Sequence, residues 1–113
     1  MQAGDSIEGL VGWEFHGEPL LDLPGMQIVA EGPAFKNNGV QNGTYTATIY
    51  DGPQDNIVFN AATIWWANGL SSPPGHINPS RHGIAQQGPD ARVQQIAHNL
   101  FERMILGPLP PGC

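Results

Sequence analysis

Glu14 and His16 are the two side chains best suited to do chemistry together. They stand one residue apart in the run G-L-V-G-W-E-F-H (residues 9–16). On an extended strand, alternate residues point to the same face, so the carboxylate and the imidazole would lie side by side. Such a pair can relay protons or activate a water molecule. An ordinary solvated strand face has the same spacing, and the pattern leaves both interpretations open.

Two further histidines, His76 and His82, lie with Arg81 in the long irregular segment 71–89. Segments of this length without regular structure are uncommon in compact domains. Two histidines six residues apart could contribute to a metal site. Zinc, however, needs about four ligands, or three and a water molecule, and no further ligand is near in sequence. Exposed loop histidines are the alternative, and the roles of His16, His76 and His82 stay open.

Other catalytic signatures are missing from the sequence. The single cysteine, Cys113, excludes an intramolecular disulfide and a thiolate metal cluster. There is no Gly-x-Ser-x-Gly nucleophile elbow, phosphate-binding loop or dinucleotide fingerprint. We therefore expect no cofactor to be held by this chain alone.

Composition and charge restrict the partners. The net charge is −6, and the four strong cations are Lys36, Arg81, Arg92 and Arg103. Nucleic acids and anionic membranes both need clustered Lys and Arg, so we expect neither as a partner. No run is apolar and long enough to span a bilayer, and no signal peptide is visible, which favours the cytoplasm. Because only 12% of the residues are charged, we expect more protein to cover part of the surface.

The residues that must position Glu14 and His16 form alternating apolar patterns. In the run 9–15, Val11, Trp13 and Phe15 would be the buried side of a strand, with Leu10 and Glu14 on the opposite face. Further strands are expected along the chain, and the four predicted strands are Gly9–Phe15, Met26–Glu31, Thr44–Tyr50 and Ile57–Ile64.

The run 56–70 carries no charge and is rich in strand-favouring residues, including Trp65 and Trp66. Both of its faces would be apolar, which predicts a central strand. The Asp51-Gly52 turn signal predicts that this strand forms an antiparallel hairpin with Thr44–Tyr50. Trp65 and Trp66 are either core residues or a sugar-stacking surface.

Asp90–Leu106 is the clearest helix pattern. Apolar residues recur every three or four positions from Val93 to Ile105. Asp90 is the expected N-cap, and Gly107 follows the last turn. The whole predicts an α+β fold: a mainly antiparallel sheet of about four strands with one C-terminal amphipathic helix on one face. We expect one domain over residues 1–106 and a Pro/Gly-rich tail over 107–113.

Four runs resemble the C-terminal part of the large subunit of N,N-dimethylformamidase and its relatives. They are A-G-D-S-I-E-G-L-V-G-W-E-F-H-G (3–17), Y-T-A-T-I-Y-D-G (45–52), V-F-N-A-A-T-I-W-W-A-N-G-L (58–70) and G-P-D-A-R-V-Q-Q-I-A-H-N-L-F-E-R-M (88–104). The resemblance implies part of a glutamine-amidotransferase-like α/β domain that hydrolyses small amides. It also implies a mononuclear iron in the complete enzyme, held by two tyrosines and a glutamate.

The resemblance carries only one functional position into this chain. Glu14, in G-W-E, matches a glutamate beside the iron that orients or activates water. The Gly-His-Asp-Glu-Tyr-Trp type motif, which supplies the ligand glutamate, is absent from this sequence, and Tyr45 and Tyr50 do not match the ligand tyrosines. No role is implied for His16.

The expected function is therefore that of the C-terminal portion of an amide hydrolase, inactive alone. It would act on a small amide only with the upstream part of the same enzyme or a companion subunit. The alternative is a non-catalytic interaction or ligand-binding module that kept the scaffold. A gene fragment, one chain of a split enzyme and a freestanding relative are all compatible with the sequence, which leaves the substrate and the oligomeric state open.

Overall fold

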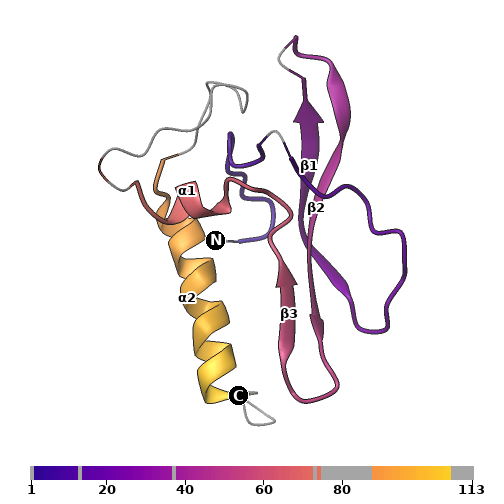
Figure 1. The fold of residues 1–113 in the computed structure, drawn as a ribbon, viewed down its shortest axis with the longest axis vertical. Helices are drawn as coiled ribbons and strands as arrows, with labels where there is room; N and C mark the ends of the chain where they lie inside the picture. The colour runs from indigo at the N-terminus through magenta and orange to yellow at the C-terminus, as the bar shows by residue number, and fades with distance from the viewer. Residues whose placement is uncertain (1, 13, 37, 73, 75–87, 108–113) are drawn as a thin grey trace.

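The chain forms a three-stranded antiparallel sheet followed by two helices (Figure 1). The computed structural model describes residues 2–12, 14–36, 38–72, 74 and 88–107. In chain order, the elements are β1 (Gln27–Phe35), β2 (Gln41–Asp51), β3 (Ile57–Asn60), α1 (Trp66–Leu70) and α2 (Ala91–Leu106). The predicted α+β class, antiparallel sheet and C-terminal helix are confirmed.

The strand β2 lies in the middle of the sheet, between β1 and β3. The β2–β3 hairpin is confirmed, with Ile49 opposite Phe59. Its turn is closed by the Gly52 N–H, which donates to the Asn56 carbonyl at 2.6 Å. The strands β1 and β2 both extend into residues 32–43, beyond the predicted bounds Met26–Glu31 and Thr44–Tyr50. Pro33 is tolerated there because β1 is an edge strand.

The predicted strand Gly9–Phe15 is wrong, so the described sheet has three strands and not four. Its described residues are irregular apart from one isolated bridge between Phe15 and Thr63. The Thr63 hydroxyl donates to the Leu10 carbonyl at 2.9 Å and accepts from the Gly12 N–H at 3.2 Å. A side chain thus satisfies backbone groups that a strand would pair in a ladder.

The prediction of a central strand over 56–70 is also wrong. The strand β3 lies at the sheet edge and ends at Asn60. Ala62 has a φ of 58°, in the left-handed region, which turns the chain away from the strand direction. Residues Trp66–Leu70 then form the short helix α1.

The helix α2 has the predicted ends. Asp90 is the N-cap, and its Oδ1 accepts from the Arg92 N–H at 2.8 Å. Gly107 follows with a φ of 73°, and its N–H donates to the Arg103 carbonyl. Positive φ suits glycine because it lacks a Cβ.

The core consists of two small clusters. Tyr45, Ala47 and Ala62 form the first, with Val11 and Phe15 packed against it. The second joins the two helices to the N-terminal segment, where Val93 is fully buried. Leu10 is buried there too and not on the exposed face that strand alternation predicts, because it packs beside Gly69.

The apolar stripe of α2 is covered only over its first turns. Val93 is buried and Leu100 half-buried, whereas Phe101, Met104 and Ile105 are 62%, 54% and 80% exposed. The second half of the helix therefore presents apolar side chains to solvent.

Several predicted features lie outside the described residues: Trp13, the loop residues His76, Arg81 and His82, and the tail from residue 108 with Cys113. No helix in the described part of the chain could cross a membrane.

Candidate functional site

Glu14 lies on a bend and is exposed to solvent. Its backbone is held nevertheless by the isolated bridge between Phe15 and Thr63, in which the Glu14 carbonyl accepts from the Ile64 N–H at 3.5 Å. An exposed carboxylate on an anchored backbone can meet a substrate or a second polypeptide without the chain rearranging.

His16 is fixed by its backbone on two sides. Its N–H donates to the Ala62 carbonyl at 2.9 Å, and its carbonyl accepts from the Thr46 N–H at 3.1 Å. The Thr46 hydroxyl donates to the carbonyl of the next residue, Gly17, at 2.5 Å. The segment 15–17 therefore lies beside β2 where β3 has already ended.

Asn60, at the end of β3, holds the imidazole of His16. The Asn60 Nδ2 lies 2.6 Å from the His16 Nδ1, and the Asn60 Oδ1 accepts from the Ala62 N–H at 2.9 Å. Sequence reasoning missed Asn60, because its partner is 44 residues away and no spacing rule links the two. The only local signal is an asparagine that ends a strand, a position where the side chain often binds a nearby backbone N–H.

His16 and Asn60 line an open hollow of about 490 Å³ on one face of the sheet. Its hydroxyl groups come from Thr46 and Thr48 of β2, whose side chains point to the same face. The loop after His16 supplies the rest of the wall, and its residues there are Gly17, Glu18, Pro19, Leu20, Leu21 and Met26.

A second hollow of about 500 Å³, here called the groove, lies on the opposite face between the sheet and α2. Tyr45 and Ile49 of β2, Phe59 of β3 and Leu100 of α2 are among its lining residues. The Tyr45 hydroxyl donates to the Ala61 carbonyl at 2.9 Å, and burial raises the pKa of Tyr45. The helix α2 therefore faces the sheet, as predicted, but an open and mostly apolar groove lies between them.

The neighbouring residues Trp65 and Trp66 have different surroundings. Trp65 is buried, and a Cβ at Gly12 would lie 2.6 Å from its ring, so the backbone of Gly12 presses on the indole. Trp66 is half-buried, lines the groove and meets Phe59 edge to face with ring centroids 5.5 Å apart. Trp65 is a core residue, and only Trp66 is placed to contact a ligand.

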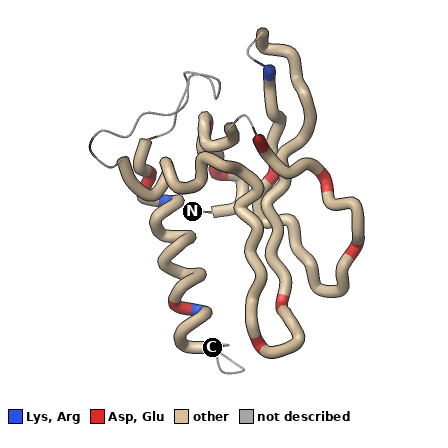
Figure 2. The backbone as a smooth tube through the Cα atoms, in the orientation of Figure 1, with Lys and Arg blue, Asp and Glu red and all other residues tan. Residues whose placement is uncertain are grey.

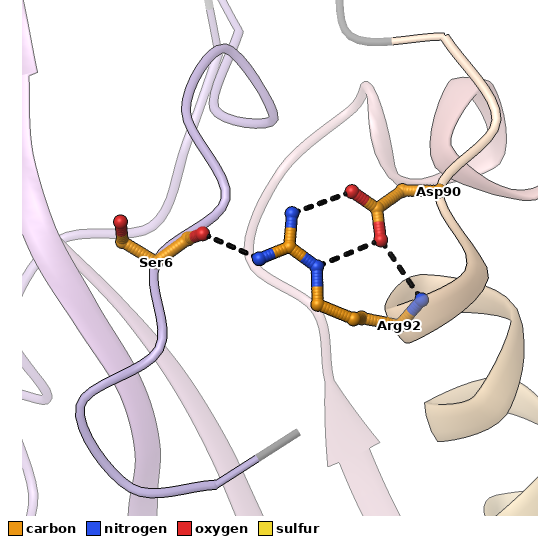
Figure 3. Close-up of polar contacts among 3 residues, drawn as sticks. All are labelled: Ser6, Asp90 and Arg92. Atoms are coloured by element: carbon orange, nitrogen blue, oxygen red, sulfur yellow. Dashed lines mark hydrogen bonds and ion pairs between the residues drawn. The ribbon is translucent and has the colours of Figure 1, made fainter.

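Asp90, Arg92 and Ser6 tie the N-terminal segment to α2 (Figure 3). The Arg92 Nε and Nη2 donate to the two carboxylate oxygens of Asp90 at 3.0 and 2.7 Å. The Arg92 Nη1 donates to the Ser6 carbonyl at 2.8 Å. Hydrogen bonds from the Arg92 side chain, and then from its backbone N–H, lower the pKa of Asp90 to about 2. This cluster is structural, because its donors are already engaged within the chain.

The described residues show no cluster of the histidine, cysteine and carboxylate side chains that commonly hold metals. No group of three or more His, Cys, Asp or Glu side chains comes together among them. The His98 Nε2 lies 3.3 Å from the Glu102 Oε1 one helical turn away, and both side chains are exposed.

Comparisons of the chain with protein-family models, with curated proteins and with solved structures found no match. The resemblance to the N,N-dimethylformamidase family remains a prediction.

Proposed function

We propose that this chain is the C-terminal portion of an amide hydrolase that resembles N,N-dimethylformamidase. It would act on the C–N bond of a small amide only with the upstream part of the enzyme. The observation that carries the proposal is the position of Glu14: its exposed carboxylate stands on a backbone held by Ile64 and by the Phe15–Thr63 bridge. In the proposed enzyme, this carboxylate meets the upstream part.

The exposed apolar surface supports an upstream part that covers this chain. Leu20, Phe101 and Ile105 are 99%, 62% and 80% exposed, and Ile105 shares its helix with the groove wall. Exposed apolar side chains that gather in patches mark contacts with other protein. Charged residues are sparse and scattered over the described backbone, so few of them interrupt such a contact (Figure 2).

In the proposed hydrolysis, Glu14 acts on water. Its carboxylate orients a water molecule and accepts a proton as the water oxygen attacks the amide carbon. The C–N bond then breaks, and the proton passes to the leaving nitrogen. Covering by the upstream part would exclude bulk water from the reacting groups.

A non-catalytic binding module is the second candidate. It is favoured by the two open hollows on opposite sheet faces. Such a module would use its hollows for a ligand or partner, and Glu14 would have no chemical role.

The coding sequence next to this chain separates the two candidates. A Gly-His-Asp-Glu-Tyr-Trp type motif upstream in the same gene, or in an adjacent gene, is the result that the hydrolase proposal expects. If the native neighbouring sequence lacks any such motif, the binding module is the better account.

A further inference from the structure

We propose that His16 and Asn60 form a binding site for small, uncharged carbonyl compounds, in which the His16 Nε2–H donates to the carbonyl oxygen. The site is the hollow on the sheet face opposite the groove. The inference rests on the proposed function only for the choice of an amide as the carbonyl compound.

The hydrogen bonds around Asn60 determine which nitrogen of His16 carries the proton. The Ala62 N–H donates to the Asn60 Oδ1, so this atom is the amide oxygen and the atom facing His16 is the NH₂ group. An amide NH₂ donates and does not accept. The His16 Nδ1 must therefore be the unprotonated acceptor, which leaves the proton on Nε2 of the neutral ring. Among the described residues, no hydrogen-bond partner is found for Nε2, and the side chain is exposed.

The backbone that orients Asn60 is strained. Ala62 is buried and has a φ of 58°, a region that residues other than glycine, asparagine and aspartate rarely adopt. Backbone strain of this kind persists where the surrounding structure enforces it, and it gathers at binding and active sites. Here it brings the Ala62 N–H onto the Asn60 amide while the Ala62 carbonyl accepts from the His16 N–H. One residue thus fixes both members of the pair.

The walls of the hollow indicate the ligand class. The His16 Nε2–H is a donor for an acceptor oxygen, and the Thr48 hydroxyl also lines the hollow. The apolar side chains of Leu20, Leu21 and Met26 suit short alkyl groups beside that oxygen. Glu18 also lines the hollow, and its carboxylate would repel an anion. A neutral amide carbonyl therefore fits better than a carboxylate.

The test uses the full-length, ¹⁵N-labelled chain, studied by NMR above the ordinary histidine pKa of about 6.5. The His16 ring nitrogens should report the neutral Nε2–H tautomer in the free chain. Adding N,N-dimethylformamide should shift the His16 Nε2 and Hε2 signals saturably, whereas formate should not. A His16 proton on Nδ1, or equal shifts with formate, would overturn the inference.

Asn60→Asp is the sharpest variant, because it keeps the acceptor for the Ala62 N–H but turns the group facing Nδ1 from a donor into an acceptor. The neutral ring should then carry its proton on Nδ1. Loss of one neutral hydrogen bond should weaken N,N-dimethylformamide binding about threefold to tenfold. His98→Gln, on the exposed face of α2, is the matched control and should bind as the original chain does. Equal binding by the original chain and a folded Asn60→Asp variant contradicts the proposal. If that variant does not fold, the tautomer of the original chain still decides.

The outcomes separate this site from the proposed function. Binding by the free chain needs no upstream part. If the complete enzyme hydrolyses amides while the His16 signals ignore N,N-dimethylformamide, only this site is refuted. If the signals respond but the complete enzyme is inactive, only the proposed hydrolase is refuted.

Discussion

Glu14 and His16 differ in how far their surroundings prepare them for chemistry. Both are exposed and flank the half-buried Phe15, so the predicted separation from the buried side holds even though no strand forms. The His16 ring is oriented by Asn60, whereas the Glu14 carboxylate is anchored only through its backbone. The alternation of residue types predicted the exposure of Glu14 and His16 but not the burial of Leu10. Asn60 could not be predicted, because its contact exists only in the folded chain.

Glu14→Gln in the complete enzyme should lower the rate of amide hydrolysis about 10²–10⁴-fold, the usual loss when a general base is removed. Folding should survive, with the free energy of unfolding changed by less than about 0.5 kcal/mol, because the side chain is exposed. Turnover measured alongside urea unfolding tests both statements. Glu31→Gln, at an exposed glutamate of β1, is the control and should leave the rate unchanged, since Glu31 lines neither hollow. Normal turnover by Glu14→Gln would remove its proposed role.

Elements that are determined by residues close together in the sequence were predicted correctly. Elements that depend on contacts between distant residues were not. The hairpin of β2 and β3 and both ends of α2 follow from turn and capping residues within a few positions of each other. The failure of Gly9–Phe15 to form a strand depends on the Thr63 hydroxyl, more than 45 residues away. The early end of β3 depends on the positive φ of Ala62, which alanine does not favour. The spacing of apolar residues along the sequence cannot predict contacts of this kind.

The Asp90 cap gives α2 a defined response to acid. Its pKa is lowered from an ordinary value of 3.8 to about 2, so the folded state binds this proton less readily than the unfolded state. Its contribution to stability is therefore complete above about pH 4 and is lost as the pH falls toward 2. Asp90→Asn keeps a capping side chain but should lose this acid-dependent component, while Asp90→Ala should lower the urea midpoint further.

Urea unfolding over that pH range, followed by circular dichroism, measures the effect. Asp22→Asn removes a charge from an exposed carboxylate elsewhere and serves as the control. The assignment of the cap fails if Asp90→Asn and Asp22→Asn give the same stability profile between pH 4 and 2.

Few side chains in the described part of the chain are buried, and many large apolar side chains are exposed. Val93 alone among the described side chains is fully buried, while the end of α2 leaves Ile105 and Leu106 80% and 77% exposed. Low charge and high apolar exposure are both expected of a chain that is normally covered. The exposed apolar surface was predictable from the low content of charged residues. The positions of the two hollows were not, because they arise from how α2 and the loop after His16 face the sheet.

Purified alone, the chain should bind no stoichiometric iron. The resemblance places the iron ligands upstream, and the described residues bring together no group of three His, Cys, Asp or Glu side chains. Elemental analysis of the dialysed chain, expressed with and without added iron, provides the measurement. One tightly bound iron in each chain would show that a complete ligand set lies within this sequence.

We propose that this chain is inactive alone and that the upstream part of an amide hydrolase needs it for activity. The direct measurement is release of dimethylamine from N,N-dimethylformamide by the chain alone, by the upstream polypeptide alone and by the two together, with iron supplied to all three. The proposal predicts turnover only in the mixture, and its loss when the added chain carries Glu14→Gln. Equal turnover by the upstream polypeptide with and without this chain would contradict it.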